Sequence, residues 1–312
     1  MLNKFKNIKP LVIGIGVAGK RHLEAQLNLG IKTGVYTTNP QTAKFLKGQK
    51  NVIVFDNLED GITWSNLVHV CTPDDKHTEY VALALKKRKA VLCEKSFTTN
   101  LKDALYLQTM AHKYKSTLII GQNYRLTPTF VKTKKRVSEG QLGKITQIET
   151  TYFHDKTEYQ KKYSSENFLY IGGSHAVDLA CWVINQPIIN VKATSKNELS
   201  YQITVTFASG LLGNIILDAG STQPKNGTDL KVYGEEGKLI SHNKLDELLF
   251  YKRDKRPESI KLPNNTTLTI ATEVKIVDDY LSGKLTSFAP LPGVDEIINT
   301  IKVLDTIKKS VS

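Results

Sequence analysis

The stretch LVIGIGVAGKRHLEAQLNLG, residues 11–30, decides the fold of this 312-residue chain. A short apolar run leads into the pattern GxGxxG, and a helical pattern follows it. Glycines at this spacing permit a tight turn and close approach of the backbone to a pyrophosphate, while the helix N-terminus offers N–H donors to the anion. We therefore expect a dinucleotide to bind here. The residues of this loop expected to contact it are Gly14, Gly16, Val17, Ala18 and Gly19.

Short apolar runs and helical patterns continue to alternate as far as residue 121. The expected strands span residues 11–15, 32–37, 52–55, 67–71, 90–93 and 117–120, and the clearest helices span residues 19–29 and 77–87, with a third capped by Asn100. Strands that alternate with helices imply right-handed crossovers and a parallel sheet. The sequence predicts an α/β domain of the doubly wound, Rossmann type over residues 1–121.

After Gly121 the pattern changes from alternating to sequential strands. A helical segment at 128–138 leads to a long strand at 145–153, and the turn ASG joins strands at 201–207 and 211–217. Strands joined by short glycine turns indicate an antiparallel sheet. Further strands are expected at 229–234 and 238–242, and closing helices at 271–283 and 293–310. We expect residues 122–312 to form an α+β substrate and oligomerisation domain, with the C-terminal helix a candidate to pack back on the first domain.

The composition excludes several classes of protein. Hydrophobic residues at 40% and charged residues at 23% are ordinary for a globular protein. The net charge of +13 comes from scattered lysine clusters without interleaved aromatic residues, so we expect no nucleic-acid partner but some attraction for anionic ligands. No apolar run approaches the ~18 residues of a membrane span and no secretory pattern opens the chain, so the expectation is a cytoplasmic protein without a membrane partner.

The cysteines give no indication of a metal site. Cys71, Cys93 and Cys181 are far apart, and none has a histidine at ligand spacing. We expect reduced thiols, mostly buried, and no metal.

The end of the second expected strand bears on the choice of cofactor. An acidic residue that would bind the ribose 2′-hydroxyl of NAD is missing from GVYTTNP, residues 34–40. Thr37, Thr38 and Asn39 stand there instead, and their hydroxyl and amide groups tolerate a 2′-phosphate that a carboxylate would repel. The expected cofactor is NADP or NAD, with a slight preference for NADP.

The stretch GGSHAVDLACW, residues 172–182, places a titratable ring beside a double glycine. The pattern predicts a helix with Ser174 as its N-cap and His175 in its first turn. Asp178 lies three residues further along, on the same face as His175. The pattern alone fits a partly buried histidine with a hydrogen-bond partner as well as a catalytic one.

Three further motifs, taken in order, carry a family resemblance. TPDDKH (72–77), VLCEKS (91–96) and GQNYRLTP (121–128) each follow an expected strand, and GGSHAVDLACW comes after them. With the glycine loop, this order resembles the Gfo/Idh/MocA family, the group of glucose-fructose oxidoreductase and inositol dehydrogenase, over essentially the whole chain. The resemblance implies a second domain with a large, mostly antiparallel open sheet, substrate bound on that sheet, and a homodimer or homotetramer.

The resemblance also implies a chemistry. Family members are nicotinamide-dependent oxidoreductases that act on a sugar, cyclitol or related polyol. The lysine of the family's EKP motif matches Lys95, with Ser96 in place of the proline, and the family's acid/base histidine matches His175. A histidine can take or return the hydroxyl proton, and a nearby lysine can polarise the reacting oxygen. The aspartate that family members carry four residues before the histidine is replaced here by Ile171.

The remaining expected contacts follow from the same motifs. Cofactor contacts are also expected from Thr72, Pro73, His77, Glu94 and Lys95, and substrate contacts from Tyr124, Arg125, Tyr163 and Asp178. Structural alternatives stay open: an ion pair between the domains for Arg125, a carboxylate facing the helix dipole for Asp178, and a role in capping or orienting the helix that it opens for His77. Two rival functions also stay open, a dinucleotide-binding sensor without turnover and a hydrolase or epimerase-like enzyme that recycles bound NAD.

Overall fold

The structure is a computed structural model that describes residues 5–157, 168–220, 227–242, 246–263 and 266–311. The chain forms two compact units. The first unit comprises residues 1–123 and 266–298, and the second comprises residues 124–265 and 299–312. Within the described residues, no helix is both long and apolar enough to cross a membrane.

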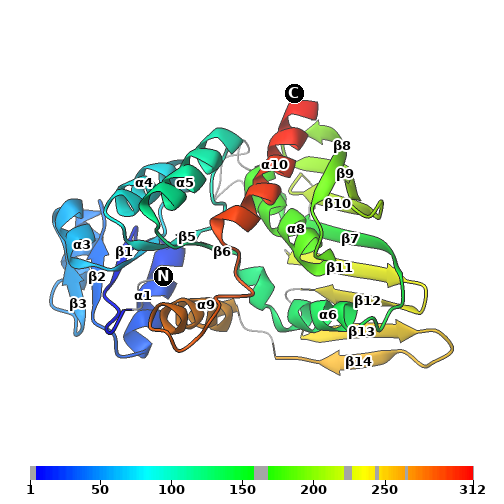
Figure 1. The fold of residues 1–312 in the computed structure, drawn as a ribbon, viewed down its shortest axis with the longest axis horizontal. Helices are drawn as coiled ribbons and strands as arrows, with labels where there is room; N and C mark the ends of the chain where they lie inside the picture. The colour runs from blue at the N-terminus through cyan, green and yellow to red at the C-terminus, as the bar shows by residue number, and fades with distance from the viewer. Residues whose placement is uncertain (1–4, 158–167, 221–226, 243–245, 264–265, 312) are drawn as a thin grey trace. The chain divides into compact units, whose positions relative to one another are not determined.

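The first unit is built on a six-stranded parallel sheet in the order β3-β2-β1-β4-β5-β6, as predicted for the Rossmann type. Helices α4 and α5 cover one face of the sheet, and α1 and α9 cover the other (Figure 1). Its strands are β1 Pro10–Ile13, β2 Thr33–Tyr36, β3 Val52–Val54, β4 Leu67–Val70, β5 Ala90–Glu94 and β6 Leu118–Gly121. Its helices are α1 Val17–Asn28, α2 Pro40–Leu46, α3 Leu58–Trp64, α4 His77–Lys86, α5 Leu101–Tyr114 and α9 Thr266–Leu281.

Two sequence signals for these elements are confirmed. The central strands β1, β4 and β5 are buried throughout, as expected for a parallel sheet covered on both faces, whereas the edge strand β3 is only partly buried. Asn100 caps α5, its Oδ1 accepting a hydrogen bond from the backbone N–H of Asp103 at 2.8 Å.

The segment 266–298 departs from the expected division at residue 121. It belongs to the first unit because α9 packs on α1. Gln26 on α1 donates a hydrogen bond to Asp278 Oδ1 on α9 at 3.2 Å, and the N–H of Ile120 donates to the carbonyl of Pro292 at 3.0 Å. Local periodicity predicts that α9 is a helix but does not say which helix it packs on.

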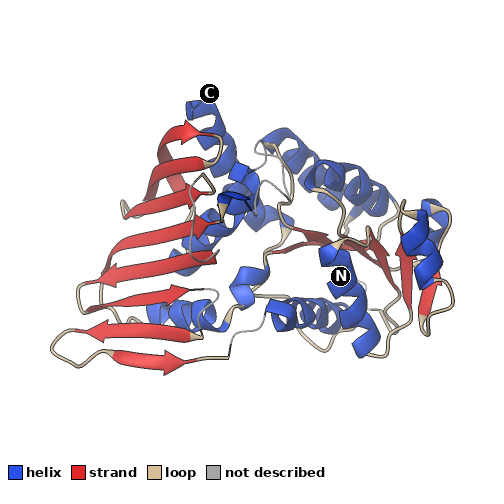
Figure 2. Cartoon of the chain, turned by 180° about the vertical axis from the view of Figure 1, so that it is seen from behind, coloured by secondary structure: helices blue, strands red, loops and turns tan. Residues whose placement is uncertain are grey.

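The second unit is built on an eight-stranded sheet in the order β14-β13-β12-β11-β7-β10-β9-β8 (Figure 2). Among the described strands of this sheet only β7 and β10 pair in parallel, so the predicted mostly antiparallel sheet is confirmed. Its strands are β7 Ile145–Phe153, β8 Ile188–Asn197, β9 Ser200–Phe207, β10 Leu212–Asp218, β11 Gly227–Gly234, β12 Gly237–His242, β13 Glu247–Lys252 and β14 Glu258–Lys261. Its helices are α6 Pro128–Ser138, α8 Phe168–Ile184 and the part of α10 Val294–Val311 from residue 299 onward.

The start of α8 differs from the prediction. The helix runs through the double glycine, so Ser174 is not its N-cap, and the Ser174 hydroxyl donates to the carbonyl of Ile171 at 3.2 Å. The glycines serve close packing instead. A Cβ on Gly172 would lie 2.6 Å from Tyr152 Cδ1, and one on Gly173 would lie 2.6 Å from Leu304 Cδ2.

Candidate functional site

The glycine loop of the first unit has the geometry of an anion cradle. Gly14 has φ +85°, and a Cβ there would lie 2.9 Å from the carbonyl oxygen of Cys71. A Cβ on Gly19 would lie 1.9 Å from the carbonyl oxygen of Gly14. A Cβ on Gly16, by contrast, would meet nothing within 4 Å, and no side chain caps α1 at this residue. The backbone at the start of α1 is thus open to a pyrophosphate.

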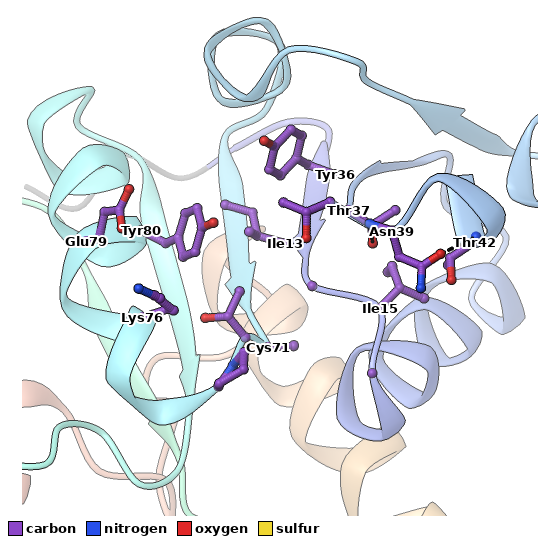
Figure 3. Close-up of a pocket in the computed structure, with 15 residues that line it drawn as sticks. Ile13, Ile15, Tyr36, Thr37, Asn39, Thr42, Cys71, Lys76, Glu79 and Tyr80 are labelled. Atoms are coloured by element: carbon purple, nitrogen blue, oxygen red, sulfur yellow. Dashed lines mark hydrogen bonds between the residues drawn. The ribbon is translucent and has the colours of Figure 1, made fainter. Parts of the chain in front are cut away.

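A cleft of about 740 Å³ lies at the carboxyl ends of β1, β2 and β4 (Figure 3). This is the edge at which open parallel sheets bind their ligands. Of the cofactor contacts expected from the sequence, the cleft is lined by Gly14, Gly16, Thr37, Thr38, Asn39, Thr72 and Pro73. Its other lining residues are Ile13, Ile15, Tyr36, Thr42, Cys71, Lys76, Glu79 and Tyr80.

The wall of the cleft after β2 presents hydroxyl groups and no carboxylate. Asn39 caps α2, its Oδ1 accepting from the N–H of Thr42 at 3.0 Å, and its own N–H donates to Thr37 Oγ1 at 3.3 Å (Figure 3). Glu79 stands on the opposite wall, on α4, together with Lys76. The position at which NAD-binding proteins place an acid is therefore held by neutral groups fixed in a turn.

His77 and Glu94 do not line this cleft. The fully buried His77 ring lies between two carbonyl oxygens, that of Thr72 at 2.9 Å from Nε2 and that of Ser96 at 3.0 Å from Nδ1. It ties the loop after β4 to the loop after β5. Glu94 is 8% exposed, and its Oε1 lies 3.0 Å from His22 Nε2. No side chain caps α4, so His77 does not have the capping role, but it holds the start of that helix against the two loops, which is the orienting alternative left open by the sequence.

Lys95 directly follows β5 and is half-buried. It does not line the cleft, and neither do Val17, Ala18 and Gly19. Its charge acts on two nearby acids, Glu94 and Asp74. Although burial opposes it, the pKa of Glu94 is lowered, mainly by the hydrogen bond and charge of His22 and less by the charge of Lys95. The Lys95 charge also acts to lower the pKa of Asp74. For Asp74 burial outweighs that effect and raises the pKa.

In the second unit, His175 stacks between two tyrosine rings. Its ring centroid lies 3.8 Å from that of Tyr124, with an interplanar angle of 14°, and 6.0 Å from that of Tyr152, with an angle of 17°. His175 is 4% exposed and Ile171, one turn earlier on α8, is 6% exposed. The stack fixes the plane of the imidazole.

Arg125 and Asp178, both expected to contact substrate, bind each other. Arg125 Nε lies 2.8 Å from Asp178 Oδ2 and Arg125 Nη2 lies 2.6 Å from Asp178 Oδ1. Both side chains are buried, and the pair joins the segment before α6 to α8 within the second unit. A bidentate pair of this kind is a structural clamp. Arg125 thus forms an ion pair, as one of the alternatives held, but its partner lies in the same unit rather than in the other domain. Tyr163 lies outside the described residues.

Five residues that line the cleft were not expected from the sequence: Tyr36, Thr42, Lys76, Glu79 and Tyr80. Tyr36 ends β2, and Lys76, Glu79 and Tyr80 lie where η1 (Asp74–Lys76) passes into α4. Position after a strand gives a signal for Tyr36 alone, because the other four lie six to ten residues beyond the end of β2 or β4.

Comparison with known families matches both halves of the chain. Residues 8–122 match the model described as the oxidoreductase family with an NAD-binding Rossmann fold, and residues 130–240 match the GFO/IDH/MocA C-terminal domain. An uncharacterized oxidoreductase of Schizosaccharomyces pombe is 30% identical over 212 residues, 63% of this chain and 56% of that protein. The scyllo-inositol 2-dehydrogenase (NADP⁺) of Bacillus subtilis is 28% identical over 185 residues, 56% of this chain and 51% of that protein.

Among solved structures, levoglucosan dehydrogenase in complex with NADH and levoglucosan superposes with a TM-score of 0.85 at 17% identity, covering 97% of both chains. This likeness extends over both units but concerns the fold. The chain spans about half the length of the curated relatives that it matches in sequence.

Proposed function

Because this chain belongs to the Gfo/Idh/MocA oxidoreductase family, we propose that it is an NAD(P)-dependent dehydrogenase or reductase acting on a hydroxyl or carbonyl group of a sugar, sugar derivative or cyclitol. The observation that carries the proposal is the cleft of the first unit, in which the glycine loop and the start of α1 leave backbone donors open. The relatives named as an NADP⁺-dependent inositol dehydrogenase and a levoglucosan dehydrogenase support the substrate class.

Two residues are proposed to act on the substrate. When bound, the nicotinamide supplies or accepts the hydride. Lys95 donates a hydrogen bond to the reacting oxygen and stabilises the negative charge that develops on it. His175 takes the hydroxyl proton in oxidation and returns it in reduction, in the ring plane set by Tyr124 and Tyr152. The assembly expected from the family resemblance is a homodimer or homotetramer.

The cofactor proposed is NADP in preference to NAD. The hydroxyl groups after β2 can receive a 2′-phosphate, whereas Glu79, the one carboxylate among the described residues that line the cleft, stands on the other wall with Lys76. Binding isotherms with the two cofactors test this directly, and NADP should bind more tightly. Equal or weaker binding of NADP would overturn the preference but not the dehydrogenase.

A substitution at the cleft sharpens that test. Thr37→Asp should reverse the preference by at least about tenfold, because a carboxylate bonds a ribose hydroxyl but repels a phosphate. Asp can accept the bond from the Asn39 N–H as Thr37 does, so the turn should persist. Thr42→Ser, on the same wall, keeps a neutral hydroxyl and serves as the matched control. An unchanged ratio in Thr37→Asp would place the adenosine ribose elsewhere.

Turnover is tested with a panel of polyols and cyclitols, followed by the absorbance of the reduced nicotinamide. His175→Asn should lower kcat by about a hundred- to ten-thousandfold while leaving the affinity for NADP unchanged. Lys95→Met should lower kcat and leave cofactor affinity within a few fold. Full activity in His175→Asn would remove the acid/base role.

Three observations favour a second function, a dinucleotide-binding protein without turnover. His175 is 4% exposed, Ile171 replaces the family aspartate, and Arg125 is held by Asp178. Tight NADP binding without oxidation or reduction of any panel member would support that function. Retained cofactor with product but no net redox change would instead support the hydrolase or epimerase-like alternative.

A further inference from the structure

A buried polar cluster lies inside the first unit, where α1, β5 and α9 meet. One ligand-type atom from each of His22, Glu94 and Glu273 lies within 4.8 Å of the other two. His22 Nε2 is 3.0 Å from Glu94 Oε1 and 3.9 Å from Glu273 Oε1. His22 and Glu273 are fully buried, and Glu94 nearly so. The three residues come from three different elements and are far apart in the sequence.

Glu273 is the unusual member of the cluster. Neither of its carboxylate oxygens has a hydrogen-bond partner, although the side chain is fully buried. A Cβ placed on Gly121, the last residue of β6, would lie 2.9 Å from Glu273 Oε1. A carboxyl group in this setting must be neutralised by a proton or by a cation. Without a metal, burial and the nearby Glu94 raise the pKa of Glu273 well above the usual value, so the proton is then the neutralising group.

The donor set suits a divalent transition metal. An imidazole nitrogen and two carboxylate oxygens are ligands that zinc binds at about 2.0–2.2 Å. At that bond length any two ligands of tetrahedral zinc lie about 3.3–3.6 Å apart. The separations of 3.0 Å and 3.9 Å lie on either side of this range, so shifts of a few tenths of an ångström in the two carboxylates would bring all three ligands to it, with a fourth position left for water. Two carboxylates and one divalent ion also leave the buried site without net charge.

A second layer of polar groups supports His22. Its Nδ1 lies 2.9 Å from Nδ1 of the fully buried His69, and His69 Nε2 lies 3.3 Å from the side-chain amide of Gln26. A metal on His22 Nε2 places the proton on Nδ1, which then donates to His69. The Gln26 amide nitrogen lies 3.3 Å from His69 Nε2 and also donates to Asp278 Oδ1 at 3.2 Å, so this layer continues to α9. Metal-binding histidines are oriented by such partners.

We propose that His22, Glu94 and Glu273 form a structural site for one divalent transition-metal ion, zinc being the best match, which fastens α9 to α1 and to the end of β5. This differs from the expectation that the chain binds no metal, which rested on cysteine spacing. The site lies within the first unit and does not depend on the reaction proposed above.

The first experiment measures metal content. Protein purified without chelator and without a nickel column should carry about one zinc per chain by mass spectrometry. After dialysis against EDTA, added Zn²⁺ should restore it and raise the Tm by at least about 3 °C, because an ion that binds only the folded form stabilises it. Glu273→Gln should lose both effects. Glu24→Gln, an exposed residue on α1, is the matched control and should keep both.

The metal-free alternative gives the opposite result. If Glu273 holds a proton, Gln is a neutral substitute of nearly the same shape, so Glu273→Gln will be as stable as the wild type or more so, and zinc will neither bind nor raise the Tm. That outcome overturns the proposal. Should Glu273→Gln fail to fold, Co²⁺ added to the dialysed wild type gives a test without a variant: visible absorption bands that Zn²⁺ abolishes support the site, and their absence rejects it. NADP binding, measured in parallel, reports separately on the proposed function.

Discussion

At the scale of single residues, Arg125 and Asp178 were both expected to bind substrate, but they form an ion pair inside the second unit. Both charges are buried, and each satisfies the other. Asp178→Asn should lower the free energy of unfolding by about 3–5 kcal/mol, because it leaves the guanidinium buried without a counter-charge. Urea unfolding of wild type and variant measures this.

The double variant Arg125→Met, Asp178→Leu is the control for that prediction. Two apolar side chains of similar size should recover most of the lost stability, since no charge is then left buried. If Asp178→Asn instead unfolds like the wild type but loses affinity for substrate, Asp178 is a substrate ligand after all.

Asp278 on α9 gives the molecule a pH dependence. Burial raises the pKa of this carboxyl from 3.8 to about 7. A raised carboxyl pKa means that the folded form holds a proton, so its contribution is full below about pH 4 and is lost as the pH rises to about 7. Asp278→Asn should match the wild type at pH 4 and exceed it at pH 8, by at most about 4 kcal/mol. Thermal unfolding at the two values measures the difference. A variant less stable than the wild type at pH 8 would contradict the raised pKa.

At this scale the sequence predicts which residues lie near the site better than it predicts which residues they contact. The loop glycines and Thr37, Thr38 and Thr72 follow a motif whose spacing is local, and all of them except Gly19 line the cleft. Glu79 and Tyr80 belong to no motif, and they reach the cleft because α4 starts beside it. The partners of Arg125 and Glu94 lie 53 and 72 residues away, and no local pattern predicts them.

At the scale of elements, the glycines of the two helices α1 and α8 are predicted to respond differently to alanine. Gly172→Ala should destabilise the chain by about 1–3 kcal/mol, because the new methyl group overlaps the Tyr152 ring and outweighs the gain in helix propensity. Gly16→Ala meets no atom within 4 Å and should leave the Tm unchanged while weakening NADP binding. Thermal unfolding and cofactor titration of both variants separate the two roles. A stable Gly172→Ala would show that α8 can move away from β7.

The starts of α5 and α8 show when the end of a helix can be predicted from the sequence. Asn100 precedes a periodic segment and caps α5 as predicted, because nothing but the cap determines where that helix begins. Ser174 also follows a break in the pattern, yet α8 continues through it, because Tyr152 and Leu304 need the space that two glycines leave. From the local sequence a glycine pair indicates a turn. Here the residues that pack on the pair show that it lies inside a helix.

At the scale of the whole molecule, the first unit is assembled from two distant stretches. A fragment of residues 1–123 should not fold stably, because it lacks α9 and leaves the buried groups of His22, Gln26 and Glu94 in water. A chain in which residues 266–298 are joined to that fragment by a flexible linker should fold cooperatively and bind NADP. Circular dichroism on heating compares the two. A cooperative transition in the shorter fragment would show that α9 is dispensable.

The topology of the two units was predictable to different degrees. Right-handed βαβ crossovers leave few arrangements for the first sheet, and the predicted doubly wound sheet is confirmed. In the second sheet β7 pairs with β10 and β11 rather than with the next strand along the chain. Pairing between distant strands depends on which faces can be buried together, which the local sequence does not encode.

The central place of β7 bears on how the protein is made. A strand that leaves the ribosome at residue 153 meets its neighbours only after residues 212–234 have been synthesised, and α1 waits still longer for α9. Both edges of a nascent β7 are unpaired throughout that interval, which is when chaperones that shield exposed strands act. Premature termination anywhere before residue 266 therefore yields a polypeptide in which neither half is complete, and such products are expected to be degraded rather than to persist as working fragments.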